Sequence, residues 1–386
     1  MRILITTDAW APQVNGVVQT LTQVVKHLRE QGHVVLVVHP GQFKTVPCPT
    51  YPEIRLALWP WRGLQHALQT FEPHAVHIVT EGPIGLAMRL LARRKGLPFT
   101  TAYHTQFPEY VKARTGIPVR LTAALLRWFH KPAKAVMVPT QSVIQTLQSR
   151  GLHNCVLWQR GVDLQRFNPA PSAAAKHLNY CPKALTQEDP QQVEVLKRLE
   201  KTHVQKPVFL YAGRVAIEKN LEAFLGLDLP GEKWVGGDGP ARKTLEKTYP
   251  NARWFGMLNH AALAELYRHA DVFVFPSQTD TFGLVLLEAM ACGCPVAAFP
   301  VNGPLDVVGQ SGAGVLGWDL QEAALAALKI DRQIPQRHAR QFTWANCTNQ
   351  FLGHLAPIGL QVGAHHRPAG LSKASSPKAK QQTSSQ

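Results

Sequence analysis

The chain has 386 residues, of which 45% are hydrophobic and 17% are charged, a composition typical of a globular protein large enough for two domains. No apolar run approaches the roughly 18 residues that cross a membrane, so we expect any role at a membrane to be peripheral. The N-terminal sequence MRILITTDAW is interrupted by Asp8 too early for a signal peptide.

Positive charge is concentrated in the first half of the chain. The net charge is +16, and residues 1–170 hold 19 Lys and Arg against 7 Asp and Glu, whereas residues 171–356 hold 18 of each kind. Residues 357–386 add 4 basic residues and no acidic one. Such charge can meet an anionic membrane, a nucleic acid or an anionic substrate. None of the 6 cysteines forms a C-x-x-C pair, which is typical of a reduced, cytoplasmic protein.

The first half of the chain alternates strands and helices. Arg2–Thr7 is predicted as a buried strand, and an amphipathic helix opens at Gly16 and ends at Gly32. Further strands are predicted over residues 33–39, 75–80, 99–104, 135–139 and 156–159, with a helix over residues 83–95. This alternation predicts a Rossmann-like parallel sheet, whose ligands bind at the carboxyl ends of the strands. His104 stands at one of these ends.

The second half opens after a segment of different composition. Residues 168–206 are rich in Pro, Ala, Ser and polar residues and are predicted to be a linker or an insertion. A strand over Val208–Ala212 then leads into Gly213, which permits a tight turn, and into Arg214 and Lys219. Two cations beside a helix start are suited to stabilise a diphosphate leaving group. Either cation alone would indicate no more than an ordinary surface residue.

Residues 271–300 are predicted to form a strand, a loop, a helix and a second strand. Asp280 lies on the loop and Glu288 on the helix. Backbone N–H groups at the helix start, residues 282–284, suit a phosphate, whereas the carboxylates suit hydroxyl groups. A phosphate beside hydroxyl groups describes a sugar nucleotide. The alternative is a helix with an acidic residue near its N-terminus and one exposed Glu.

The segment SQTDTFGLVLLEAMACGCPV, residues 277–296, resembles the acidic pair of the retaining GT-B glycosyltransferases of family 4. This resemblance covers about residues 1–355 without the linker, and it implies an α/β protein of two Rossmann-like domains with parallel sheets that face a central cleft. The implied parts are an acceptor-binding domain (1–167), the linker (168–206), a nucleotide-sugar-binding domain (207–335), a helix that crosses back to the first domain (336–356) and a disordered basic tail (357–386).

The resemblance also implies roles for single residues. In AYHTQFPEY, His104 would meet the donor sugar near its reacting carbon. In GRVAIEKN, Arg214 and Lys219 would hold the diphosphate. Asp280 stands where the family often has Glu and would act on the sugar, while Glu288 would hold the ribose of the nucleotide.

Six further donor-binding residues are implied by similar family segments: Gly16, Arg160, Gly237, Phe282, Gly283 and Leu284. In the family, the acceptor hydroxyl attacks the sugar on the face that the phosphate leaves, and a donor phosphate oxygen takes its proton. No protein nucleophile is then required. We expect no metal and no cofactor, only a nucleoside-diphosphate sugar as co-substrate, and the sequence contains no His/Asp cluster with metal-ligand spacing.

The expected function is transfer of a hexosyl group, with mannose favoured, to a hydroxyl of a lipid or glycan. TEGPIGLAMR, YHTQFPEYV and VNGPLDVV resemble bacterial GDP-mannose-dependent α-mannosyltransferases and the neighbouring sulfoquinovosyl- and glucosyl-diacylglycerol synthases. A UDP-sugar-dependent diacylglycerol transferase remains the alternative, because the residues do not distinguish guanine from uracil. A nucleotide-sugar 2-epimerase would need more acidic residues in the first half. A nucleic-acid-binding protein would interleave aromatic residues with its basic ones, so no nucleic-acid partner is expected.

Residues 118–131, PVRLTAALLRWFHK, are predicted as a helix with Arg120, Arg127 and Lys131 on one face. We expect this face to contact an anionic membrane, enlarged by Arg89 and residues 93–95 of an earlier helix. The protein would then be cytoplasmic and peripheral on the inner face of the cell membrane. The alternative is a core-packed helix whose basic residues are solvated.

Overall fold

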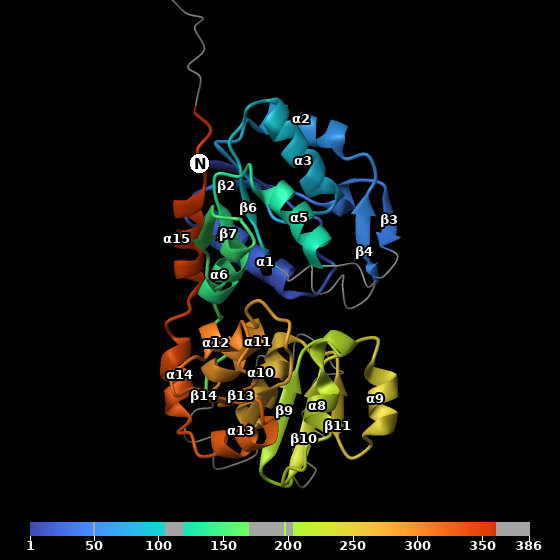
Figure 1. Cartoon of the computed structure of the whole chain (residues 1–386), viewed down its shortest axis with the longest axis vertical. Helices are drawn as coiled ribbons and strands as arrows, with labels where there is room; N and C mark the ends of the chain where they lie inside the picture. Colours follow the sequence, from blue (N-terminus) through green and yellow to red (C-terminus); the bar gives the residue numbers. More distant parts are fainter. Residues whose placement is uncertain (49–50, 105–118, 170–196, 198–203, 360–386) are drawn as a thin grey trace, which may run out of the picture.

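The computed structural model describes residues 1–48, 51–104, 119–169, 197 and 204–359. They form two α/β domains, which Figure 1 shows one above the other, with the last helices running along one side of both. The expectations for residues 170–196, 198–203 and 360–386, which include most of the linker and of the tail, lie outside the described residues. Of the helices that the structure describes, none is long and apolar enough to cross a membrane.

The first domain is built on a parallel sheet with the strand order β2-β1-β5-β6-β7-β8. Its strands are β1 (Arg2–Thr6), β2 (Val34–Val38), β5 (Ala75–Ile78), β6 (Thr100–Ala102), β7 (Val136–Val138) and β8 (Cys155–Leu157). The helices are α1 (Gly16–Glu30), α2 (Trp61–Phe71), α3 (Pro83–Arg94), α5 (Val119–His130) and α6 (Gln141–Ser149). Helices on both faces bury apolar strands, which is why these strands read as continuous apolar runs.

An antiparallel hairpin that the sequence did not predict joins β3 (Thr45–Cys48) to β4 (Tyr51–Ala57). It lies at the side of the first domain in Figure 1. Prolines within and between these strands removed the usual strand signal, because proline cannot donate to a ladder.

The second domain repeats the architecture with the strand order β11-β10-β9-β12-β13-β14, again all parallel. Its strands are β9 (Val208–Ala212), β10 (Glu232–Gly236), β11 (Arg253–Gly256), β12 (Val272–Phe275), β13 (Val296–Ala298) and β14 (Gly314–Leu316). The helices are α8 (Leu221–Leu225), α9 (Arg242–Thr248), α10 (His260–His269), α11 (Leu284–Ala291), α12 (Pro304–Val307), α13 (Leu320–Ala327) and α14 (Gln333–Ala339). The predicted strand–loop–helix–strand unit at residues 271–300 is confirmed as β12, α11 and β13.

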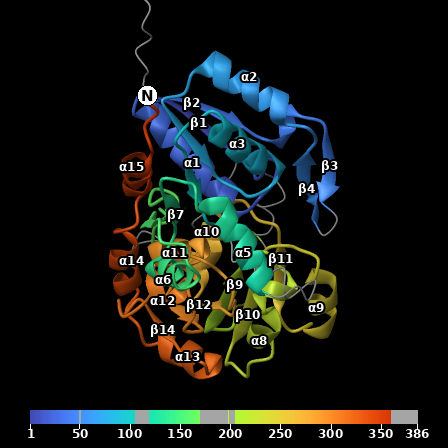
Figure 2. The ribbon, with the colours of Figure 1, turned by 45° about the horizontal axis from the view of Figure 1, so that its top comes forward.

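The C-terminal crossing segment consists of two helices, so the prediction of one helix over this region is wrong. α14 packs against the second domain, and α15 (Trp344–His354) packs against the first, as both Figure 1 and Figure 2 show. Between them, the N–H of Val162 donates to the carbonyl of Phe342, and Thr343 caps α15 by accepting from Asn346. The chain therefore leaves the helical path in order to pair with the end of the first domain.

Candidate active site

Two loops of the second domain meet at the carboxyl ends of neighbouring strands. One follows β9 and contains a short 3-10 helix, Ile217–Lys219, and the other follows β12. Because β9 pairs with β12, these loops lie side by side. The Nζ atom of Lys219 lies 2.6 Å from Oδ1 and 2.8 Å from Oδ2 of Asp280. A cation and a carboxylate are thus held together at the carboxyl ends of the strands, where open parallel sheets bind ligands.

Gly213 and Gly237 bring two backbone segments closer than any side chain would allow. Their φ angles of 145° and 129° lie in the region that favours glycine. A Cβ atom on Gly237 would lie 1.9 Å from the carbonyl oxygen of Gly213. The N–H of Gly213 also donates to the carbonyl of Gly236 at 2.9 Å. The loop that carries the exposed side chain of Arg214 is therefore fixed against the loop after β10.

Helices from both domains begin at the same place between the domains. Gly283, with a φ of 82°, is the N-cap of α11, and Phe282 before it is buried in the core. A Cβ atom on Gly16 would lie 3.5 Å from Cδ1 of Leu284, and Val17 and Leu284 pack against the same hydrophobic cluster, so the start of α1 lies beside the start of α11. Helix N-termini favour negative charge, and two of them converge here.

Glu288 on α11 is buried between the two domains. Its carboxylate accepts from Nε2 of Gln19 on α1 at 3.1 Å and from the hydroxyl of Tyr267 on α10 at 3.4 Å. Burial raises the pKa of Glu288 to about 7, and the two hydrogen bonds offset part of this effect. The residue predicted to hold a ribose therefore accepts hydrogen bonds from one residue of each domain.

His104 at the end of β6 contacts the same loop of the second domain. Its carbonyl oxygen accepts from Oγ1 of Thr281 at 2.7 Å, and Thr281 is the neighbour of Asp280. Burial and the nearby Arg160 guanidinium hold the pKa of His104 well below its usual range, so the imidazole is neutral at physiological pH. His104 and Asp280 thus reach the site from opposite domains.

Arg160 lies deeper than a surface donor-binding residue would. It is 4% exposed, and its Nη1 donates to the carbonyl of Trp158 at 2.5 Å. Its Nη2 lies 3.3 Å from Nδ1 of His104. The guanidinium therefore contacts His104 directly.

This arrangement matches known proteins along most of the chain. A family model described as Glycosyltransferase Family 4 matches residues 14–166, and one described as Glycosyl transferases group 1 matches residues 194–340. A GDP-mannose-dependent alpha-mannosyltransferase of Mycobacterium tuberculosis is 32% identical over 93% of this chain and 97% of its own. The chain belongs to glycosyltransferase family 4.

Two further matches bear on this glycosyltransferase. An alpha-monoglucosyldiacylglycerol synthase of Streptococcus pneumoniae is 27% identical over 77% of this chain and 71% of its own. The solved structure of a sucrose-phosphate synthase from Thermosynechococcus elongatus superposes with a TM-score of 0.69 at 20% identity, over 91% of this chain and 97% of that one. The predictions of family 4, of the two-domain GT-B fold and of a nucleotide-sugar-dependent glycosyltransferase are confirmed.

The structure brings most of the predicted site residues into one region between the domains. The residues gathered there are Gly16, His104, Arg160, Lys219, Asp280, Phe282, Gly283, Leu284 and Glu288. Arg214 and Gly237 join it through the loops after β9 and β10. Arg120, Arg127 and Lys131 lie on or next to α5, outside these contacts, with exposed side chains.

Arg89 does not belong to the exposed basic surface, so that expectation is wrong. It is 1% exposed, donates from Nε to the carbonyl of Phe129 at 2.9 Å, and donates from Nη2 to that of Trp128 at 2.6 Å. The guanidinium also stacks on the Trp128 ring, 3.8 Å from its centroid. Arg89 thus satisfies carbonyl groups in the last turn of α5, whereas residues 93–95 are exposed as predicted.

Sequence reasoning missed Gln19, Tyr267 and Thr281, which contact the predicted residues. Gln19 lies three residues after Gly16 and so shares its helix face, a spacing that could have identified it. Tyr267 is a buried tyrosine whose hydroxyl needs a partner, but the sequence does not say which. Thr281 depends on how the two domains meet, for which no local signal exists.

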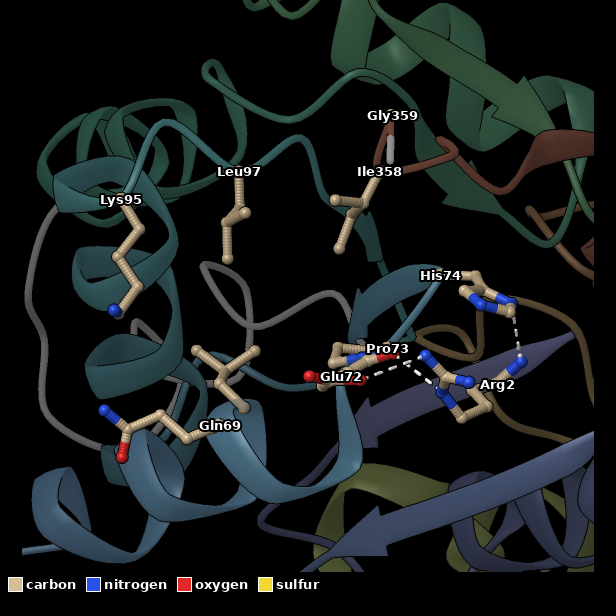
Figure 3. A pocket seen from close by; sticks show the side chains of 10 residues that line it. Arg2, Gln69, Glu72, Pro73, His74, Lys95, Leu97, Ile358 and Gly359 are labelled. Atoms are coloured by element: carbon tan, nitrogen blue, oxygen red, sulfur yellow. Dashed lines mark hydrogen bonds and ion pairs between the residues drawn. The ribbon is translucent and has the colours of Figure 1, made fainter. Parts of the chain in front are cut away.

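A pocket at the amino ends of strands in the first sheet, shown in Figure 3, is separate from this region. It is lined by residues near the amino ends of β1, β5 and β6, including Arg2, His74 and Leu97. Its Arg2 is held by the carbonyl of Glu72, to which Nε donates at 2.8 Å.

Within the described residues, no cluster of three or more His, Cys, Asp or Glu side chains could hold a metal ion.

Proposed function

We propose that this glycosyltransferase is a retaining enzyme that moves a mannosyl group from GDP-mannose to a hydroxyl of a lipid or glycolipid at a membrane surface. The observation that carries the proposal is the ion pair between Lys219 and Asp280 beside the start of α11. Thr281, the residue after Asp280, donates to the carbonyl of His104 in the other domain. The pair supports the proposal because Lys219 could bind a phosphate and Asp280 a sugar hydroxyl of the same donor molecule.

In this proposal, Lys219 and Arg214 neutralise the diphosphate as the bond between the sugar and the phosphate breaks. Negative charge grows on the leaving oxygen, so cations fixed beside it stabilise the transition state more than the ground state. The acceptor hydroxyl attacks on the face that the phosphate leaves, and its proton passes to a phosphate oxygen of the leaving group. The new bond to the sugar carbon has the original configuration.

Asp280 and Glu288 divide the hydroxyl groups of the donor between them. Asp280 lies beside Lys219 and accepts from sugar hydroxyls next to the diphosphate. Glu288 lies further along α11 and accepts from the ribose, which replaces Gln19 as its hydrogen-bond donor. Gly16 and Leu284, which lie beside each other across the domains, would flank the diphosphate with helix N-termini.

The lipid acceptor is supported by the surface of α5. Thr122, Leu126 and Phe129 are buried, so one side of the helix packs on the domain. The other side exposes apolar residues beside the predicted basic ones: Leu121 is 65%, Leu125 56% and Trp128 47% exposed. In Figure 2, no other helix is drawn in front of α5. An apolar stripe flanked by Arg and Lys suits an anionic lipid surface, where basic charge and buried apolar area add.

The second candidate is a UDP-glucose- or UDP-sulfoquinovose-dependent diacylglycerol glycosyltransferase, which the diacylglycerol-glycosylating relative favours. A donor screen separates the two. GDP-mannose, UDP-glucose and UDP-sulfoquinovose are each incubated with the full chain and anionic vesicles that contain diacylglycerol or a glycolipid. Acceptor-dependent release of GDP with a mannosylated lipid product supports the first candidate. Release of UDP instead supports the second, and release that does not depend on the acceptor contradicts transfer altogether.

A further inference from the structure

Arg160 is held in one position by groups of the first domain and of the crossing segment. Its guanidinium lies 4.2 Å from the centroid of the Trp158 ring and donates to the Trp158 carbonyl. The Trp158 indole N–H donates in turn to the carbonyl of Cys347 on α15 at 3.1 Å, and its ring packs against Phe351, 5.3 Å between centroids. Because Trp158 is fully buried, the guanidinium has little freedom to rotate away.

The contact between Arg160 and His104 defines which imidazole nitrogen carries the proton. A guanidinium only donates hydrogen bonds, so Nδ1 of His104, 3.3 Å from Nη2, must accept. In a neutral imidazole the proton is then on Nε2. That Nε2 is buried and has no hydrogen-bond partner among the described residues. A buried donor without a partner is costly, which points to a ligand atom as its partner.

Burial keeps the His104 ring neutral, and the charges around it act in the same direction. Arg160 follows β8, His77 lies on β5 and His130 on α5, and all three disfavour a second positive charge. His130 is bonded to the carboxylate of Glu81 at 3.1 Å, while the carboxylate of Asp280 is paired with Lys219. The ring is thus surrounded by cationic or neutral nitrogen groups, with the nearby carboxylates bonded elsewhere.

We propose that Arg160 is a positioning residue for the transfer reaction. It fixes His104 as the neutral tautomer protonated on Nε2, and this N–H donates to an oxygen of the bound nucleotide sugar. The inference rests on the proposed function for the identity of the ligand, but not for the tautomer. It moves Arg160 from direct donor binding to a role that is exerted through His104.

The tautomer is tested on the unliganded full chain by NMR of ¹⁵N-histidine-labelled protein. The His104 signals are identified by their loss in His104→Gln. We expect an unprotonated Nδ1 and a protonated Nε2 in wild type and in Arg160→Lys, which keeps a donor and a positive charge. In Arg160→Met, the pKa of His104 should rise because a neighbouring positive charge is gone. A wild-type His104 with its proton on Nδ1, or with both nitrogens protonated at neutral pH, would overturn the proposal.

The kinetic test uses the donor and acceptor identified by the screen. Arg160→Met should lower kcat about tenfold with a smaller change in the KM of the nucleotide sugar, as expected for one misplaced hydrogen bond. Arg160→Lys should restore most of the rate, because it keeps a donor and a positive charge beside Nδ1 of His104. An unchanged kcat in Arg160→Met, or a loss that Arg160→Lys does not restore, would contradict the inference.

The matched control is Arg166→Met. The Nη1 of Arg166 lies 3.2 Å from Nδ1 of His260, the same kind of contact, but Arg166 is exposed and outside the site. It should leave kcat and the His104 signals unchanged. If no donor is transferred, the proposed function fails while the tautomer measurement still decides the role of Arg160. If Arg160→Met does not fold, wild type and Arg160→Lys carry the NMR test.

Discussion

Lys219 and Asp280 form a two-point ion pair across two loops of the second domain, with Nζ at 2.6 and 2.8 Å from the carboxylate oxygens. Both side chains are 19% exposed, so the pair is partly shielded from water. Under the proposed function, a diphosphate would therefore meet a cation that is already paired with a carboxylate. The pair would separate when the donor binds, with Lys219 turning to the phosphate and Asp280 to a sugar hydroxyl.

Removing a cation should abolish most of the transfer activity. Lys219→Ala and Arg214→Ala should each lower kcat by ~10²–10³-fold, because the growing charge on the diphosphate loses a fixed electrostatic partner. Circular dichroism and unfolding in urea should show a folded protein in both cases, since neither side chain is in the core. Near-normal turnover of either variant at saturating donor would remove that residue from the site.

Replacing each of the two carboxylates separately should distinguish nucleotide binding from the transfer step. Glu288→Ala should weaken binding of the free nucleoside diphosphate by about tenfold, because ribose hydrogen bonds to a charged group are lost. Asp280→Ala should act mainly on kcat and leave that binding intact, since it meets the sugar that the free nucleotide lacks. Asp280→Glu restores the residue that the family often has and should be tolerated. Calorimetric titration of the nucleotide checks this division, and equal losses in both alanine variants would contradict it.

The buried Glu288 should make stability depend on pH. Its folded pKa is raised from 4.5 to about 7, so its contribution to the free energy of unfolding is fully present below about pH 4.5 and is lost as pH rises through about 7. The loss should be on the order of 3 kcal/mol when wild type is compared with Glu288→Gln, in which that group cannot ionise. Urea unfolding of both proteins across this range, without nucleotide, measures it. A pH-independent difference would mean that Glu288 is solvated in the unliganded protein.

The strand ends that build the site were predictable, but the contacts between them were not. Apolar runs that end at Gly213 and at Pro276 placed Arg214, Lys219 and Asp280 at carboxyl ends of a parallel sheet, because that architecture follows from local periodicity. The pairing of Lys219 with Asp280 depends on the neighbouring order of β9 and β12, which local patterns do not encode. The same limit explains why the hydrogen bond between Gln19 and Glu288 was not predicted, since the two residues lie in different domains.

Burial of charged residues was the other limit. The sequence around Arg89 and Arg160 does not indicate their partners. These are backbone carbonyl groups and, for Arg160, also a histidine, which only the fold brings close. A period of 3.6 residues shows which side chains share a helix face, but it does not say which face is covered. For α5, both faces carry leucines, and only the structure separates buried Leu126 from exposed Leu125.

Arg89 should stabilise α5 by binding its last carbonyl groups. Arg89→Met keeps an apolar side chain of similar length but leaves the carbonyls of Trp128 and Phe129 without this donor, which should cost about 1–3 kcal/mol of unfolding free energy. Arg93→Met, an exposed change on the same helix, should cost less than about 0.5 kcal/mol. Urea unfolding checks both, and equal effects would show that the buried hydrogen bonds contribute nothing.

The exposed face of α5 should bind anionic membranes. Each basic residue near an anionic lipid surface contributes about 1 kcal/mol, so changing Arg120, Arg127 and Lys131 to Gln should weaken vesicle binding by roughly 100-fold. Leu121→Gln with Leu125→Gln should weaken it as well, because the apolar contact with the acyl boundary is lost. Co-sedimentation with anionic vesicles at low salt measures both effects, and binding of wild type should fall steeply as salt rises.

A matched control separates this surface from bulk charge. Changing Lys243, Lys247 and Lys329, exposed basic residues of the second domain, to Gln removes the same net charge. If binding depends on α5, this variant should sediment like wild type, because its lost charges lie outside the proposed contact surface. An equal loss in both triple variants would assign the binding to net charge alone. Absence of wild-type binding, or binding that salt does not weaken, would favour a water-soluble acceptor and leave α5 as a helix that stabilises the first domain.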